Sequence, residues 1–534
     1  MSDNNSTPIC PETASLLSKT TTDEERTIIV KDVSLARLAL TMSTAWSSVF
    51  LAALDSTIVA TLSAPISSEF HSLSLFSWLA TGYFISTAAC QPISGRLTDI
   101  FGRGPGLAFC NLVFAAGNLI CGLAGNQYVI IVGRVVAGIG GGGLLSIATF
   151  LASDLIPLRQ RGLIGAIGNL WFGVGCMTGG VVGGILNDYT AMGWRLAFLI
   201  QVPPSILSAI AVTLLVKVPP KQSDRSHLAR IDFVGVFLTS SFLVLLVFGL
   251  NAGGNLTPWA HPLPITSLLL SFLLFILFIW WESRARQPII PVKLLLDRTV
   301  SCACLTSLVV AMLANTAIFF VPLYLQILGE TATSAGLRML SSPVGMAFGA
   351  LGSGYLMRRT GKFVGLGMAS VLLLLVGAVL LCLQSQDTPA TLTTAAFFFI
   401  GAGYSAVLSV TQIACIAAVD HSQQAVVTSI TFLGRSLGGT AGITIVSAIY
   451  QNTLDSRLWW RFGGEPDAEA IIGRLRNDIG QLRHVPAEWR PGVVASFSEA
   501  FRYVWLTVLA WALLAIVCVS PIKQHKLHSS LDRK

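Results

Sequence analysis

Apolar residues along this chain gather into long runs, separated by short polar breaks and by glycine- and proline-rich turns. Each run is close to 20 residues long, the length of an α-helix that crosses a bilayer. Strands of a membrane barrel would be shorter and would alternate apolar with polar residues. The pattern therefore predicts about fourteen membrane-spanning helices. They are expected near residues 40–64, 76–95, 106–124, 127–151, 163–186, 196–216, 233–251, 263–281, 300–322, 335–357, 363–383, 391–418, 425–449 and 502–520.

The composition supports this interpretation. Of the 534 residues, 53% are hydrophobic and 11% are charged, whereas soluble domains carry about 25% charged residues. We therefore expect an all-α polytopic membrane protein. Residues 1–37 are polar and mixed in charge, so no cleavable signal peptide is expected. The net charge of +8 does not indicate nucleic acid, because membrane proteins collect Lys and Arg in cytosolic loops.

The basic residues predict the orientation. With the amino terminus in the cytosol, the loops after spans 2, 4, 6, 8 and 10 carry fifteen Lys and Arg, and the short opposite loops carry only Arg195 and Arg338. The loop at 450–500 is an exception, because it places six Arg on the non-cytosolic side, together with seven acids that leave it near neutral. The cytosolic set comprises Arg96, Arg103, Arg159, Arg161, Lys217, Lys221, Arg225, Arg230, Arg284, Arg286, Lys293, Arg298, Arg358, Arg359 and Lys362.

The short basic loop at 217–231 lies near the midpoint and suggests a joint between two halves. GRLTDIFGR after span 2 and GYLMRRTGK after span 10 are similar turns at corresponding places, as in transporters built from repeats. The predicted organisation has five parts. They are a cytosolic tail (1–37), an amino-terminal six-helix half (38–216), a linker with two extra helices (217–298), a carboxy-terminal six-helix half with a lumenal loop at 450–500 (299–521), and a cytosolic tail (522–534).

Asp55 is the most informative single residue, because it lies inside the first apolar run, AWSSVFLAALDSTIVATLSAP. A carboxylate at mid-membrane costs roughly 2.5–3.5 kcal/mol on insertion scales, so it usually pairs, titrates or binds something. It is the only carboxylate well inside a predicted span. We expect Asp55 to carry a proton, to bind a cationic substrate, or to do both in competition. A fixed ion pair with Arg134 or Arg435 is the alternative.

GRLTDIFGR at 95–103 places Gly95, Asp99, Gly102 and Arg103 in the turn between spans 2 and 3. This turn resembles the loop motif of the major facilitator superfamily, G-x-L-x-D-x-x-G-R-[RK]. Gly104 departs from the final basic position. The resemblance implies that these residues act in conformational change.

GRVVAGIGGGG at 133–143 is similar to the superfamily motif R-x-x-Q-G-x-G, with Ala137 in place of the glutamine. By this resemblance Arg134 helps to couple protons to transport. Pairing with a carbonyl or a carboxylate is the alternative role.

GVGCMTGGVVGGIL at 173–186 carries Gly175, Gly179 and Gly183 at small-xxx-small spacing, followed by Gly184. It resembles the antiporter motif G-x-x-x-G-P-x-x-G-G, with Gly180 in place of proline. A purely structural packing face is the alternative.

Further segments occur in order along nearly the whole chain: LDSTIVATLSAPI, SDLIPLRQRG, GWRLAFLIQVP, PLYLQ and GRSLGG. Together they resemble the fungal fourteen-span drug:proton antiporter branch, and most of all its vacuolar basic amino acid transporter group. The resemblance implies the major facilitator fold, with two six-helix halves and two extra linking helices.

Other polar or aromatic residues in the spans are candidates to line a central cavity. Hydrogen bonding between helices is the alternative role for each uncharged one. The candidates are Asn169, Trp171, Asn315, Tyr324, Gln326, Gln412 and Arg435.

Two signals concern sorting and modification. Glu12, Leu16 and Leu17 fit the acidic dileucine pattern [DE]-x-x-x-L-L, which adaptor complexes read for vacuolar delivery, although such hexamers also arise by chance. Asn255 heads an Asn-Leu-Thr sequon in a loop predicted to be non-cytosolic, so we expect glycosylation there.

The resemblance implies a proton-coupled antiporter that moves small cationic solutes, with Lys, Arg and His carried into the vacuole as the favoured substrates. The alternative is a plasma-membrane exporter of drugs or secondary metabolites with the same coupling. No phosphate-binding loop, metal cluster or nucleophile constellation is evident in the sequence, so we expect neither an enzyme nor a cofactor. The expected partners are a small-molecule substrate, protons, the bilayer and a sorting adaptor complex, and the expected state is a monomer.

Overall fold

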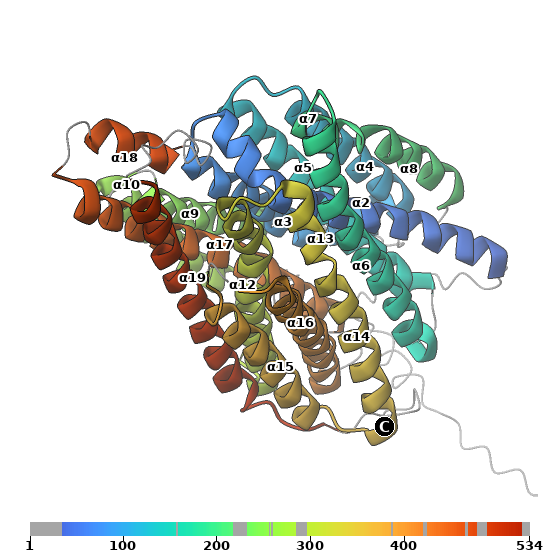
Figure 1. Ribbon diagram of the computed structural model, residues 1–534. Helices are drawn as coiled ribbons and strands as arrows, with labels where there is room; N and C mark the ends of the chain where they lie inside the picture. The colour runs from blue at the N-terminus through green and yellow to red at the C-terminus, as the bar shows by residue number, and fades with distance from the viewer. Residues whose placement is uncertain are drawn as a thin grey trace, which may run out of the picture.

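The computed structural model describes residues 35–155, 158–216, 232–255, 257, 260–284, 296–385, 388–419, 424–464, 468–477 and 489–525. These residues are overwhelmingly helical (Figure 1). The helices are α2 (Leu35–Glu69), α3 (Leu73–Phe101), α4 (Arg103–Gly122), α5 (Gln127–Leu155), α6 (Leu158–Tyr189), α7 (Trp194–Leu199), α8 (Val202–Leu215), α9 (Phe233–Asn255), α10 (Pro262–Glu282), α12 (Arg298–Ile327), α13 (Ala332–Met339), α14 (Ser341–Thr360), α15 (Val364–Cys382), α16 (Ala390–Ala418), α17 (Gln424–Phe462), α18 (Ala468–Asn477) and α19 (Arg490–Val519).

Every predicted span falls on a helix or a helix pair. Within the described residues, 11 helical segments are long and apolar enough to cross a membrane. They include neither α3 nor α14, and the apolar part of α9 is the shorter segment Val234–Leu250. The all-helical polytopic architecture agrees with the sequence, whereas the count of about fourteen crossings and the orientation stay predictions.

Two predicted spans are broken into two helices each. The span at 196–216 consists of α7 and α8, and Pro203 and Pro204 lie in the first turn of α8. The span at 335–357 consists of α13 and α14, with Pro343 in the first turn of α14. Proline lacks a backbone N–H, so it is tolerated in a first turn and interrupts a helix elsewhere.

The predicted loop at 450–500 is largely helical in the structure, because α17 continues to Phe462, α18 follows, and α19 begins at Arg490. Charged residues pair at the ends of α17 and α19. Arg461 Nη2 lies 2.5 Å from Glu499 Oε1, and Arg457 Nε lies 3.1 Å from Glu499 Oε2. These pairs extend both helices beyond their apolar runs.

The helices pack in two groups. In the first group, α2 packs on α6, and α5 packs on α3 and α4 (Figure 1). In the second group, α14 and α15 pack on α16, and α12 packs on α17 and α19. The linking helices α9 and α10 pack on each other, and α9 contacts both α3 and α17. The joints at 217–231 and 285–295 lie outside the described residues, so the domain boundaries stay a prediction.

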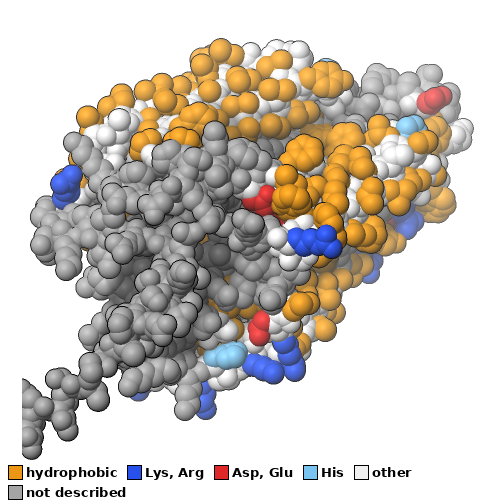
Figure 2. Space-filling view, turned by 180° about the vertical axis from the view of Figure 1, so that it is seen from behind, with side chains coloured by type: hydrophobic (Ala, Val, Ile, Leu, Met, Phe, Trp, Pro, Cys, Tyr) orange, Lys and Arg blue, Asp and Glu red, His pale blue; other side chains and the backbone are white. Residues whose placement is uncertain are grey.

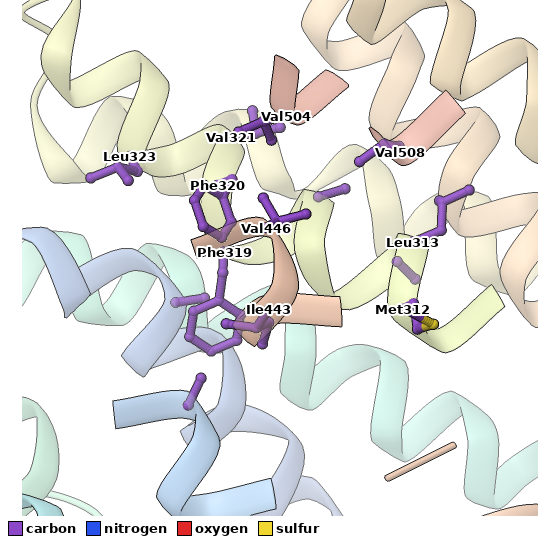
Figure 3. Close-up of a cluster of buried hydrophobic side chains, with 14 of the residues drawn as sticks. Met312, Leu313, Phe319, Phe320, Val321, Leu323, Ile443, Val446, Val504 and Val508 are labelled. Atoms are coloured by element: carbon purple, nitrogen blue, oxygen red, sulfur yellow. The ribbon is translucent and has the colours of Figure 1, made fainter. Parts of the chain in front are cut away.

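Buried aromatic and aliphatic side chains join α12, α17 and α19. Phe319 and Phe320 lie near Ile443 of α17 (Figure 3), and Val504 and Val508 are fully buried. Phe76 of α3 extends this core into the first group, with ring centroids 5.1 Å from Phe320 and 6.3 Å from Phe319.

The outer surface is strongly apolar. Hydrophobic side chains dominate the described surface in Figure 2, where Lys and Arg are few and scattered. On α10, Leu269 and Phe272 are each 64% exposed. A soluble monomer rarely exposes apolar patches this extensive, and a lipid environment accounts for them.

Glycines let α14 approach α16 closely. A Cβ at Gly349 would overlap the backbone carbonyl oxygen of Ala402, whereas a Cβ at Gly352, one turn further along α14, would meet nothing within 4 Å. In a bilayer such small residues allow the close packing that replaces the hydrophobic effect between helices.

This contrast gives a matched pair of substitutions. Gly349→Ala is expected to destabilise the protein by about 1–3 kcal/mol through overpacking. Gly352→Ala is expected to be neutral or slightly stabilising, because alanine favours a helix. Thermal unfolding of the two purified variants checks this. Equal melting temperatures would contradict the α14–α16 packing described here.

Candidate functional site

Asp55 and Arg134 form an ion pair in the interior of the first helix group. Arg134 Nη1 lies 2.7 Å from Asp55 Oδ2, and the side chains are 1% and 0% exposed. Asp55 comes from the middle of α2 and Arg134 from α5. The sequence analysis gave such an ion pair as the alternative role for both residues.

The neighbouring helix α3 holds the guanidinium in place. Arg134 Nε donates a hydrogen bond of 3.1 Å to the backbone carbonyl of Leu79. Its Cζ atom lies 4.4 Å from the ring centroid of Tyr83, within range of a cation–π interaction. The arginine therefore ties together α2, α3 and α5.

Local sequence explains why α5 comes so close to α3. A Cβ at Gly138 would overlap the backbone oxygen of Tyr83, and one at Gly142 would lie 2.7 Å from the backbone oxygen of Thr87. Thr87 Oγ1 also donates to the backbone carbonyl of Gly138 at 3.1 Å. The glycine run beginning at 138 thus brings the ion pair within reach of Tyr83.

The pair is electrically neutral but only partly satisfied. Asp55 Oδ1 is buried and has no hydrogen-bond partner among the described residues. Removing one partner of a buried pair leaves an uncompensated charge, which is strongly unfavourable. A proton arriving at Asp55 would discharge the carboxylate and release Arg134, so this arrangement can respond to protonation.

Further polar groups lie near this pair. Cys176 Sγ of α6 donates to the backbone carbonyl of Ala53 in α2 at 3.9 Å. Tyr83 of α3 is buried, and its ring lies against Arg134. Tyr83 and Cys176 were missed in the sequence, although the rule that selected Asn and Gln inside apolar runs would also have selected tyrosine.

The predicted glycine stripe of α6 packs against α2. Cβ atoms at Gly175 and Gly179 would overlap the backbone of Phe50 and Leu54, and Gly183 lies beside Ile58. Its close-packing role is therefore visible, while an antiport role for the stripe stays a prediction.

A second glycine face of α6, formed by Gly180 and Gly184, contacts α13 of the other helix group. A Cβ at Gly184 would lie 2.6 Å from Thr333 Cα, and one at Gly336 would overlap the Gly180 carbonyl. Nearby, Asp188 Oδ2 accepts hydrogen bonds from Thr333 N at 2.9 Å and Thr333 Oγ1 at 2.5 Å. These contacts join the two halves at one end of the bundle.

The loop motif is only partly described. Arg103 is buried, donates to Thr98 Oγ1 at 2.5 Å, and lies over the Phe150 ring. Gly102 has φ 98°, a left-handed conformation that favours glycine in the tight turn. A Cβ at Gly104 would overlap the Val216 carbonyl, which explains why no longer side chain stands there. Placements at Gly95 and Asp99 lie outside the described side chains.

The remaining cavity candidates have different surroundings. Gln326 donates to the Thr61 carbonyl at 3.2 Å, a contact between α12 and α2. Asn315 donates to Ala311 O of its own helix at 3.0 Å. Tyr324 is 5% exposed, and its ring centroid lies 5.0 Å from that of Phe501.

Tyr324 therefore packs in the aromatic core, and its role in lining a cavity stays a prediction. Trp171 makes an edge contact with Phe50, with ring centroids 6.4 Å apart, and Gln412 is half-buried on α16. The side chains of Asn169 and Asn255 lie outside the described part, as do Glu12, Leu16 and Leu17.

Comparison with known proteins identifies the class. The sequence profile of the Major Facilitator Superfamily matches residues 45–443. The chain therefore belongs to the Major Facilitator Superfamily, a family of membrane transporters. It is an integral membrane transporter and not an enzyme, as the sequence predicts.

Two relatives come from the fission yeast Schizosaccharomyces pombe. The chain is 35% identical to the multidrug resistance protein fnx1, over 91% of this chain and 93% of the relative. It is 32% identical to the vacuolar membrane amino acid uptake transporter fnx2, over 90% of this chain and 83% of the relative. These matches confirm the predicted resemblance to the fungal branch.

Solved structures confirm the fold. A bacterial homologue of the human lysosomal transporter Spinster superposes with a TM-score of 0.67 at 16% identity, covering 91% of this chain and 97% of that one. A D-xylose–proton symporter superposes with a TM-score of 0.57 at 13% identity, covering 83% and 96%.

The ion pair can be tested by a double-mutant cycle. Asp55→Asn and Arg134→Gln are each expected to destabilise the protein by about 3–5 kcal/mol, since each strands a buried charge. The double variant strands none, so it should be less destabilised than the sum of the two. Thermal unfolding of the four proteins measures the coupling, and strictly additive effects would show that the two residues do not interact.

Proposed function

We propose that this transporter is a proton-coupled antiporter that carries small cationic solutes, chiefly Lys, Arg and His, into the vacuole. The single observation that carries the proposal is the buried pair of Asp55 and Arg134. An ionisable carboxylate this deep in a membrane protein is a functional site by default. The name of fnx2, a vacuolar amino acid uptake transporter, supports the choice of substrate.

In this proposal, protonation of Asp55 and binding of a substrate cation are alternatives. Both neutralise the carboxylate, and both compete with Arg134 for it. One proton moving down a pH gradient supplies about 1.4 kcal/mol per pH unit, and the electrical term adds about 2.3 kcal/mol per charge per 100 mV. One or two protons are enough to concentrate a small cation in an acidic lumen.

The same scaffold also supports a second candidate, the export of drugs or secondary metabolites across the plasma membrane. The observation that favours it is the 35% identity with a protein named for multidrug resistance. Both candidates share the proton-coupled site and differ in the membrane and in the substrate.

Proton coupling is tested in vacuolar vesicles. Asp55→Asn is expected to abolish lysine-driven proton efflux, because the amide cannot carry a proton at these pH values. Asp297→Asn is the matched control. Asp297 is exposed and caps α12 through bonds to the backbone N of Thr299 and Val300, and asparagine caps a helix equally well.

Proton efflux is recorded with a pH-sensitive dye, and protein abundance is measured in the same vesicles. Wild-type efflux in the Asp55→Asn vesicles would refute the assignment of the proton to this carboxylate.

Localisation separates the two candidates. A fluorescently tagged chain is expected on the vacuolar membrane, and the double substitution Leu16→Ala/Leu17→Ala is expected to redirect it to the plasma membrane, since the proposed adaptor signal is lost. Plasma-membrane localisation of the unaltered chain would favour the exporter.

A further inference from the structure

Arg435 is a membrane-embedded cation with no counter-ion among the described residues. Its Nε atom is buried and has no hydrogen-bond partner. Nothing in the described part of the chain forms an ion pair or hydrogen bond with its guanidinium, which contacts the Phe432 ring with Cζ 4.7 Å from the centroid. Arg134 of the first half, by contrast, is paired with Asp55.

The three helices α12, α16 and α17 supply no acid close to Arg435. α12 and α16 contain neither Asp nor Glu, and α17 contains neither between Gln424 and Leu454. Among the described side chains of these helices, nothing compensates the positive charge of Arg435.

An unpaired charge inside a membrane protein is expensive and marks a ligand or ion pathway. Guanidinium groups present a planar fork of N–H donors that matches a carboxylate with two parallel hydrogen bonds. The missing partner is thus an anion of that geometry.

Arg435 also lies near the seam between the two halves. The next residue, Ser436, donates a hydrogen bond of 3.2 Å from its Oγ to Gln91 Oε1 of α3 in the first half. One turn beyond Arg435, Gly439 lies beside Asn315 of α12, whose Nδ2 would be 3.1 Å from a Cβ there. Polar groups from α3 and α12 therefore lie near this part of α17.

We infer that Arg435 binds the carboxylate of the transported substrate. The inference rests on the proposed function and narrows it. The substrate is an α-amino acid that carries a carboxylate as well as a cationic group, with the carboxylate on Arg435 in one half and the cationic end towards Asp55 in the other. A simple lipophilic cation would meet the positive charge of Arg435 without compensation.

The test is binding of radiolabelled lysine to the purified full-length protein, with unlabelled lysine, lysinamide and cadaverine as competitors. Lysinamide and cadaverine keep the cationic groups and lack the carboxylate. Wild type is expected to bind lysine at least about tenfold more tightly than either analogue, as the loss of a charge-assisted hydrogen bond predicts.

Arg435→Gln is expected to weaken lysine binding at least about tenfold. The affinity for cadaverine should be unchanged or improved, so the variant should no longer prefer lysine to cadaverine. Arg435→Lys keeps the positive charge but lacks the planar fork of N–H donors, so it should retain part of the preference for lysine over cadaverine. Arg284→Gln is the matched control. Arg284 is exposed at the end of α10 and contacts Trp280. Thermal unfolding of each variant verifies that it is folded.

The outcomes distinguish the inference from the proposed function. Equal binding of lysine and lysinamide by wild type would overturn the carboxylate assignment and leave cation transport standing. Failure of wild type to bind any basic amino acid would overturn the proposed function and the inference together. A third outcome concerns chloride. If chloride raises the melting temperature of wild type but not of Arg435→Gln, and does not compete with lysine, Arg435 binds an inorganic anion and the inference is overturned.

Discussion

The buried pair of Asp55 and Arg134 is the interaction on which the first half depends. Water cannot solvate either group, so each requires the other, and the helices that carry them must stay close. Arg134 extends this requirement to α3 through Leu79 and Tyr83. Three helices are thus held by one guanidinium, and its partner carboxylate is the one group there that a proton can discharge.

Close packing through glycine makes this arrangement attainable. Between helices in lipid the hydrophobic effect is weak, and association depends on van der Waals contact and hydrogen bonds. α6 uses two neighbouring glycine faces for different purposes. Gly175 and Gly179 fix it to α2 inside one half, and Gly180 and Gly184 rest on α13 of the other half. This second contact is reinforced by the hydrogen bonds between Asp188 and Thr333.

The sequence was sufficient for much of this picture and insufficient for the rest. Asp55 was recognisable because a carboxylate in an apolar run is chemically conspicuous. Its partner was not, because Arg134 and Arg435 are both arginines inside apolar runs and only the three-dimensional packing of α2 against α5 selects one of them. The surroundings of Tyr324 were not predictable, because a phenol in a span looks the same in sequence whether it faces water or packs against Phe501.

Charge distribution connects the two halves. The first half has a neutral pair at its centre, and the second half has an arginine with no counter-ion in the described part of the chain. A positive centre disfavours a bare cation and is neutralised by a carboxylate, so a zwitterionic substrate with an additional cationic group fits both halves at once. In the proposed mechanism, the cationic end of a substrate whose carboxylate is bound competes with Arg134 for Asp55, as a proton does. Substrate and proton would then exclude each other at the Asp55 carboxylate, and this exclusion would couple their exchange.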